Sequence, residues 1–172
     1  GADGLVHQLE TAGKEVILLS GDRAVSVCAV AQALGIGRWQ AGVLPDQKAV
    51  FVQKLQDSGR KVLMVGDGLN DTGALAAAHV SISPAQALDA ARAASDVVLL
   101  GKDLSPIADA LKTACHATKR IRENFRIATV YNIVAVPLAV AGLATPLIAA
   151  LAMSLSSLTV SVNALRVAGT GK

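Results

Sequence analysis

The most constraining feature of this sequence is a long stretch without a charged side chain. From Ile127 to Leu165 there is no Asp, Glu, Lys or Arg. The whole chain is apolar as well, with 52% hydrophobic and 17% charged residues, against about a quarter charged in ordinary soluble domains. Two buried helices of a larger soluble protein would explain the stretch, but 172 residues offer little other protein to cover it. We therefore expect a small domain joined to a membrane hairpin.

The uncharged stretch divides into two predicted transmembrane helices, residues 127–143 and 147–165, within a hairpin at 127–167. The turn between them is Ala144–Pro146. Each helix is close to the roughly 20 residues that cross a hydrocarbon core about 30 Å thick. Arg126, Arg166 and Lys172 flank the outer ends, and the turn has no basic residue. The positive-inside rule then places both ends, including a tail at 168–172, in the cytoplasm.

Residues 1–102 alternate short apolar runs with stretches of helical spacing. The predicted strands are EVILLS (15–20), KVLMVG (61–66), HVSIS (79–83) and DVVLL (96–100). Predicted helices lie between them at 24–35, 46–59 and 70–78. This order favours an open parallel sheet of the Rossmann-like α/β class, with ligands bound at the carboxyl ends of the strands. A basic stalk helix is predicted at 103–126, with Ser105 as its N-cap and Pro106 as its first residue.

The stretch KVLMVGDGLND ends a predicted strand in a cluster of acids and glycines. Asp67 and Asp71 are the acids, and Gly66 and Gly68 allow close approach of the backbone. Carboxylate oxygens with waters and a phosphate suit Mg²⁺. Asn70 can hydrogen-bond the same anion. Taken alone, the stretch could also be a turn followed by a helix N-cap.

Two further stretches favour a phosphate site. In LLSGDR a strand again ends in a hydroxyl, a glycine and an acid, so that Ser20 and the Gly21 amide can donate to a phosphate, next to Asp22. In LPDQKA, Lys48 lies just inside a helix, where the helix dipole and the ammonium both attract an anion. The set matches phosphoryl transfer without its nucleophile.

The motifs SGD, PDQK and GDGLND, in this order, resemble the phosphorylation domain of a P-type ATPase, a haloacid-dehalogenase-like fold. The resemblance covers nearly the whole chain and implies an incomplete phosphorylation domain. The family's phosphorylated Asp belongs to a DKTG motif that is not in this sequence. By position, Asp67 and Asp71 would hold Mg²⁺, Ser20 and Lys48 would neutralise the aspartyl-phosphate, and Asn70 would help hold it. Thr72-Gly73 departs from the family's Ala-Pro.

The apolar end resembles the copper-type members of the heavy-metal branch. Those members place Tyr-Asn in the penultimate helix and Met with Ser four residues later in the last, matching Tyr131-Asn132 and Met153 with Ser157. A thioether suits the soft ion Cu(I), whereas zinc and cadmium members carry an Asp that is absent here. The alternative for Met153 is packing against lipid, and for Ser157 close helix contact. The closest likeness is to the bacterial copper-exporting subclass associated with cbb3 oxidase.

The resemblance implies the C-terminal part of an ATP-driven pump that exports Cu(I) across a bacterial inner membrane. Its partners would be lipid, the soft metal ion and the upstream actuator domain, nucleotide-binding domain and CPC helix. Alternatives are a Zn/Cd-type pump, a membrane-tethered phosphatase of the same fold, or a non-catalytic partner of a pump. With 2% aromatic residues and a net charge of +3, the chain is not expected to bind nucleic acid. Without the strand that bears the nucleophile, we expect a gap in the sheet, low stability and no activity alone.

Overall fold

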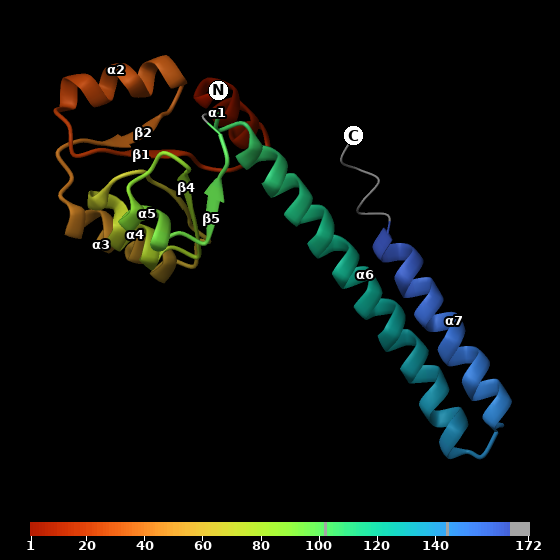
Figure 1. The fold of residues 1–172 in the computed structure, drawn as a ribbon. Coiled ribbons are helices and arrows are strands. Elements are labelled where there is room, and N and C mark those ends of the chain that lie inside the picture. The colour runs from red at the N-terminus through yellow and green to blue at the C-terminus, as the bar shows by residue number, and fades with distance from the viewer. Residues whose placement is uncertain (102, 144, 166–172) are drawn as a thin grey trace. The chain divides into compact units, whose positions relative to one another are not determined.

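A computed structural model describes residues 1–101, 103–143 and 145–165 of the chain. The predicted tail at 168–172 and the flanking Arg166 lie outside these residues. The chain divides into two compact units, Gly1–Ala108 and Asp109–Lys172, which are described separately. The elements, shown in Figure 1, are α1 (Ala2–Thr11), β1 (Ile17–Leu19), α2 (Ala24–Leu34), β2 (Arg38–Gln40), α3 (Pro45–Asp57), β3 (Leu63–Val65), η1 (Leu69–Asp71), α4 (Thr72–Ala77), β4 (Val80–Pro84), α5 (Asp89–Ala93), β5 (Val97–Leu99), α6 (Pro106–Val140) and α7 (Pro146–Leu165).

The first unit has the predicted α/β order with parallel strands. All four predicted strands are present as β1, β3, β4 and β5, and the three predicted helices are α2, α3 and α4. The α2 helix ends as its sequence indicates, because Gly35 takes a left-handed φ of 74° that L-residues avoid. The elements α1, β2 and α5 were not predicted, and the start of the helix predicted at 70–78 is instead the separate 3-10 turn η1.

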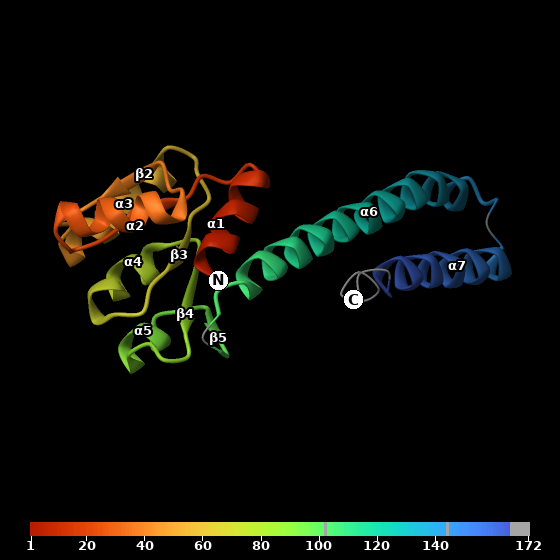
Figure 2. The same ribbon diagram turned by 90° about the horizontal axis from the view of Figure 1, so that it is seen from above.

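The strands form two separate sheets. β1 pairs with β2, and β3, β4 and β5 form a second sheet in that order, with every pairing parallel. Within residues 1–101, no ladder joins β1 to β3. Figure 1 shows the β1–β2 pair apart from β4 and β5, and Figure 2 shows β3 beside β4, with which it pairs. The expected gap in the sheet is therefore present between β1 and β3.

The hydrophobic core of this unit is divided in the same way. One cluster contains Val6, Ala31 and Ile36, with Leu18 and Trp39 of the first sheet packed against it. The other contains Leu75, Ala87 and Ala91, with Met64 of the second sheet. The two halves are connected by packing of α3 on α4 and by polar contacts.

One polar bridge lies just before the strands begin. Glu15, two residues before β1, accepts hydrogen bonds from Arg38 at the start of β2 (2.7 Å) and from Arg60 ahead of β3. Arg38 also lies over the ring of Phe51, 5.7 Å from its centroid. Because all three charged side chains are well exposed, we expect this bridge to add little to stability on its own.

The second unit consists of most of α6, together with α7. The α6 helix starts at Pro106, as predicted, and continues without a break through the predicted stalk and into the first predicted span. The helix ends at Val140, three residues before the predicted end of the first span at 143. Gly142, with a φ of 73°, turns the chain just after the helix. Figures 1 and 2 show α6 and α7 running antiparallel.

In the described part of the chain, one helix is long and apolar enough to cross a membrane. This is α7, with a mean hydropathy of 1.7 and none of that window buried. The α6 helix begins in the charged stalk, so its apolar part is confined to the residues from Ile127 to Val140. The second membrane span remains a prediction.

Candidate functional site

The loop after β3 is built around the side chain of Asp71. The loop passes through Gly66 and Gly68 before the single turn η1, which ends at Asp71. A Cβ added at Gly66 would lie 2.7 Å from Asp71 Cβ and 3.0 Å from its Cγ, closer than real Cβ atoms approach. At Gly68 the nearest atom would be Asp71 Oδ2 at 3.7 Å, an ordinary contact. Gly66 is thus required by close packing, whereas Gly68 is not.

Lys48 reaches this loop from α3 and forms a buried ion pair. Its Nζ lies 2.7 Å from Asp71 Oδ1, and the two residues are only 8% and 9% exposed. The Gly68 N–H approaches the other carboxylate oxygen at 3.4 Å. Since α3 follows β2 and η1 follows β3, the ion pair also connects the two halves of the split sheet.

Asp67 differs from Asp71 because its carboxylate makes no hydrogen bond or ion pair with the described residues. Its backbone C=O accepts from the Leu88 N–H at 3.2 Å, which fixes the loop against the start of α5. One available carboxylate beside an open glycine backbone fits Mg²⁺, which is bound by one or two carboxylates together with phosphate and water. Asp67 is therefore the better ligand candidate, since one oxygen of Asp71 is already held by Lys48.

The SGD turn after β1 has its own hydrogen bonds. The Asp22 N–H donates to Ser20 Oγ at 3.1 Å, and the Ser20 hydroxyl donates to Asp22 Oδ2 at 3.3 Å. A Cβ on Gly21 would meet the Val43 carbonyl at 3.4 Å. Among the described residues, no hydrogen bond joins this turn to Lys48 or Asp71. That Ser20 and the Gly21 amide donate to a phosphate next to Asp22 remains a prediction.

The departure at Thr72-Gly73 does not prevent the helix from forming. The α4 helix begins at Thr72, and the Thr72 hydroxyl donates to the Leu69 carbonyl at 2.9 Å. A Cβ on Gly73 would lie 3.6 Å from Ala49 Cβ, so these small residues meet where α4 faces α3. Asn70 lies in η1, and its predicted role remains untested.

Ser81 and Asp96 form a polar clamp in the second sheet. Ser81 donates to Asp96 Oδ2 through its hydroxyl (2.9 Å) and its N–H (2.8 Å), and the Asp96 N–H donates back to Ser81 Oγ (3.1 Å). The hydrogen bond from the Ser81 hydroxyl, aided by that from its N–H, lowers the pKa of Asp96 below its ordinary value. The clamp connects β4, which pairs with β3, to the residue before β5. Sequence reasoning did not find it.

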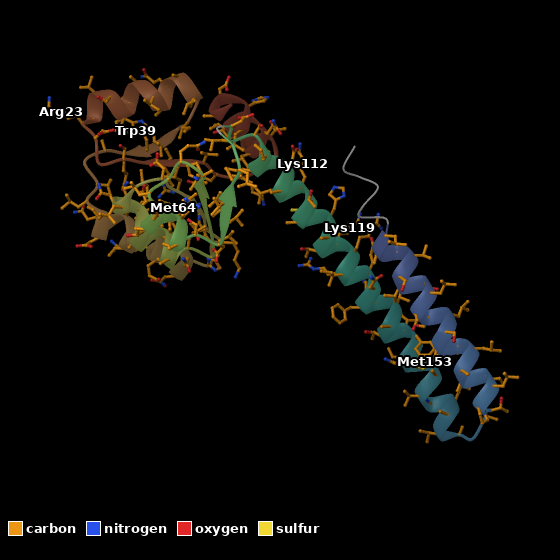
Figure 3. The ribbon with its side chains drawn as sticks, in the orientation of Figure 1. Arg23, Trp39, Met64, Lys112, Lys119 and Met153 are labelled. Carbon is orange, nitrogen blue, oxygen red and sulfur yellow. The ribbon has the colours of Figure 1, made fainter. Side chains whose placement is uncertain are left out.

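The predicted ligands of the transported ion lie on both helices of the second unit. Tyr131 and Asn132 are on α6, and Met153 and Ser157 are one turn apart on α7. Met153 is 69% exposed and is labelled in Figure 3. The described contact between the helices is elsewhere: Asn163 Nδ2 donates to Asn124 Oδ1 at 2.8 Å. Within the described residues no hydrogen bond joins any two of these four side chains, and their ligand role remains a prediction.

The fold of the first unit matches a known class. A family model described as "haloacid dehalogenase-like hydrolase" matches residues 1–79, which contain the SGD turn, Lys48 and the GDGLND loop. This unit is a haloacid-dehalogenase-like domain.

Similarity to known proteins extends over the whole chain. It is 50% identical to "Nitrogen fixation protein FixI" of Rhizobium leguminosarum bv. viciae, covering 100% of this chain and 23% of that protein. It is 41% identical to "Copper-exporting P-type ATPase" of Staphylococcus aureus (strain JH9), and the match covers 96% of this chain and 21% of that protein. The solved structure of a zinc-transporting PIB-type ATPase in the E2.Pi state matches with a TM-score of 0.89 and 29% identity. The match covers 96% of this chain and 27% of that chain.

This chain belongs to the P-type ATPases, in their heavy-metal-transporting branch. It spans about a fifth to a quarter of the length of the curated relatives that it matches.

Proposed function

We propose that the chain is the C-terminal part of an ATP-driven pump that exports Cu(I) from the cytoplasm through an aspartyl-phosphate. The buried Lys48–Asp71 pair beside Asp67 carries this proposal. The ammonium of Lys48, held by Asp71, and the available carboxylate of Asp67 both lie at the end of β3. The carboxyl ends of the strands are where a parallel α/β sheet binds its ligand. The aspartate that is phosphorylated would come from a strand seated between β1 and β3, where the sheet is split.

Each residue of the site has a defined part in this proposal. A magnesium ion would lower the charge repulsion between the phosphoryl group and the carboxylates, and Asp67 would hold it. Lys48 would attract the anionic phosphoryl group while its contact with Asp71 keeps the ammonium in place. Ser20 and the Gly21 amide would donate to phosphoryl oxygens from the β1 side, and Asn70 from the β3 side. ATP would be supplied by an upstream nucleotide-binding domain of the same polypeptide.

The proposed ion is Cu(I), and Zn²⁺ or Cd²⁺ is the second candidate. Copper is favoured by the thioether of Met153, a soft ligand, and by the similarity to the copper-exporting P-type ATPase of Staphylococcus aureus. The second candidate is kept because the solved protein that matches over 96% of this chain is zinc-transporting. Tyr131, Asn132 and Ser157 would complete the copper site, with the helices embedded in a bacterial inner membrane and the α/β unit in the cytoplasm.

The phosphoryl-transfer part is tested with Asp67→Asn in the complete pump. We expect metal-stimulated ATPase activity and formation of the acyl-phosphate to fall by at least about 100-fold, because the variant loses an Mg²⁺ ligand. The matched control is Asp57→Asn, which removes an exposed carboxylate at the end of α3. Activity retained in Asp67→Asn would refute the assigned role.

The ion is tested separately with Met153→Ala, measuring ATPase activity stimulated by Cu(I) and by Zn²⁺. We expect copper stimulation to be lost. Leu155→Ala is the control, since Leu155 is similarly exposed on the same helix. Unchanged copper stimulation would refute the ligand role but leave the pump intact, whereas zinc stimulation alone would favour the second candidate.

Two other functions remain for comparison. A membrane-tethered phosphatase would hydrolyse small phosphate esters without any metal stimulation of ATP hydrolysis. A non-catalytic partner would copurify with a separate, complete pump and show no ATPase activity. Both would be excluded by a reading frame that continues upstream into the DKTG and CPC motifs.

A further inference from the structure

The α6 helix carries a stripe of cations above its apolar part. Lys119, Arg122 and Arg126 follow one another at spacings of three and four residues, which places them on one face of the helix. All three are exposed, and they line a shallow hollow along α6 together with Cys115. Figure 3 labels Lys119 on this part of α6. We call Lys119, Arg122 and Arg126 the basic stripe.

The basic stripe has no ion-pair partner in the described part of the chain. None of its three residues forms an ion pair there, whereas the neighbouring Arg120 pairs with Glu123 at 2.7 Å. Arg120 is thus the ion-pair partner of Glu123, and its hydrogen bond is the main cause of the lowered pKa of Glu123. Glu123 also lines the hollow, and the charge of Lys119 contributes to lowering its pKa. From Lys119 to Arg126 there are four cations and one carboxylate, so the stripe keeps a net positive charge.

The contact between the two helices leaves the stripe uncovered. Asn163 of α7 donates to Asn124 Oδ1 at 2.8 Å and to Glu123 Oε2 at 3.5 Å, which identifies the face of α6 that meets α7. At about 100° per residue, the three cations lie about 140–160° around the helix from Asn124 and about 40–100° from Glu123. The stripe therefore lies to one side of the contact with α7, and the two asparagines do not cover it.

The height of the stripe matches the headgroup layer of a membrane. The uncharged stretch of α6 begins directly after Arg126, and the contact with Asn163 places the end of α7 at the same level. From Arg126 to Lys119 the helix rises about 10 Å. The headgroup layer on each side of a bilayer is about 5–8 Å thick, and the long side chains of Lys and Arg extend toward it.

We infer that the basic stripe binds the phosphate groups of anionic phospholipids in the cytoplasmic leaflet. The inference rests on the membrane placement in the proposed function, but not on copper or on ATP hydrolysis. Clusters of basic residues next to a membrane helix attract an anionic surface, and each residue contributes about fivefold to the affinity. Arginine can also bind a phosphate through two parallel hydrogen bonds.

The test compares lipids bound to the purified 172-residue chain in an uncharged detergent, by native mass spectrometry with equal amounts of phosphatidylglycerol and phosphatidylcholine. We expect a preference for phosphatidylglycerol that falls about 100-fold or more in Lys119→Gln/Arg122→Gln/Arg126→Gln. The control Lys14→Gln/Lys54→Gln/Lys61→Gln removes the same charge from exposed positions of the α/β unit and should keep the preference. Substitutions at such exposed positions have little effect on stability, so folding should be preserved.

Two further measurements show whether the bound phosphate belongs to a lipid or is free, and whether a negative result concerns the stripe or the membrane placement. Millimolar inorganic phosphate should not displace the lipid; displacement would show a site for free phosphate and overturn the inference. Equal preference in the stripe variant and the control would overturn it as well, while leaving the proposed pump unaffected. If the chain did not enter phosphatidylcholine vesicles at all, the membrane placement of the proposed function would itself be wrong.

Discussion

Replacing Lys48 by Met tests whether the buried ion pair holds the site together. The substitution keeps most of the side-chain volume and removes the charge. Asp71, which is 9% exposed in the parent, would then have only the Gly68 N–H, at 3.4 Å, as a partner for its carboxylate among the described residues. A buried carboxylate that loses its cation keeps its desolvation cost without compensation.

The expected cost follows from the burial of the pair. Breaking a buried pair by removing one partner costs about 3–5 kcal/mol, whereas exposed pairs contribute about 0–1 kcal/mol. Because the side chains of Lys48 and Asp71 are 10% and 13% exposed, we expect a loss near 3 kcal/mol, at the lower end of about 3–5 kcal/mol. For a unit of about 100 residues, this loss lowers the Tm by more than about 10 °C.

Urea unfolding of the 172-residue chain in detergent measures the loss. Trp39 is the sole tryptophan and lies in the α/β unit, so its fluorescence reports on that unit alone. If the variant is unfolded without urea, the titrations are repeated in sucrose, which strengthens folding of both proteins.

The double variant Lys48→Met/Asp71→Asn separates the ion pair from general packing. Removing both charges should recover at least about 2 kcal/mol of the loss, because no charge is left buried alone. The reasoning would be refuted if Lys48→Met cost less than about 1 kcal/mol, or cost the same amount in the Asp71→Asn background.

Two other predictions concern the loop and the clamp. Gly66→Ala should lower stability by about 1–3 kcal/mol and reduce ATPase activity of the complete pump, because its Cβ would meet Asp71 Cβ at 2.7 Å. Asp96→Asn should make stability less dependent on pH in acid. The pKa of Asp96 is lowered in the folded state, so its contribution is present above the ordinary carboxyl pKa and is lost as pH falls through the folded pKa.

Matched measurements check both predictions. Gly68→Ala is the control for the loop, since its Cβ would have ordinary contacts and its φ is −108°. Equal stability of the two alanine variants would contradict the role of close packing at Gly66. For the clamp, urea midpoints are compared between neutral pH and about pH 3; the gap between the parent and Asp96→Asn should shrink in acid. A gap that stayed constant would show that Asp96 does not contribute through its charge.

Local sequence signals account for most of the elements. Apolar β-branched runs predicted four of the five strands, and Ser105-Pro106 located the start of α6. The strand Arg38–Gln40 was missed because it is short and contains no β-branched residue. The helix α5 was missed because its five residues, DAARA, are too few to show helical periodicity.

The candidate site divides in a similar way. The sequence identified Lys48, Asp67 and Asp71 by residue type and by their places at the ends of elements. It did not show that Lys48 pairs with Asp71, because the two residues are 23 positions apart and meet only when α3 packs beside η1. It also gave no sign that the Asp67 carboxylate, unlike that of Asp71, has no hydrogen-bond or ion-pair partner among the described residues.

By itself, then, the sequence determined the α/β class, the phosphate-site motifs and the uncharged stretch, since each depends on periodicity or on neighbouring residues. The gap in the sheet was also expected, from the missing strand. The pairing of β1 with the unpredicted β2, the buried ion pair across the gap and the Ser81–Asp96 clamp were decided by the tertiary structure. Each of these joins residues from different elements, and only the packing of those elements sets the distances between their side chains.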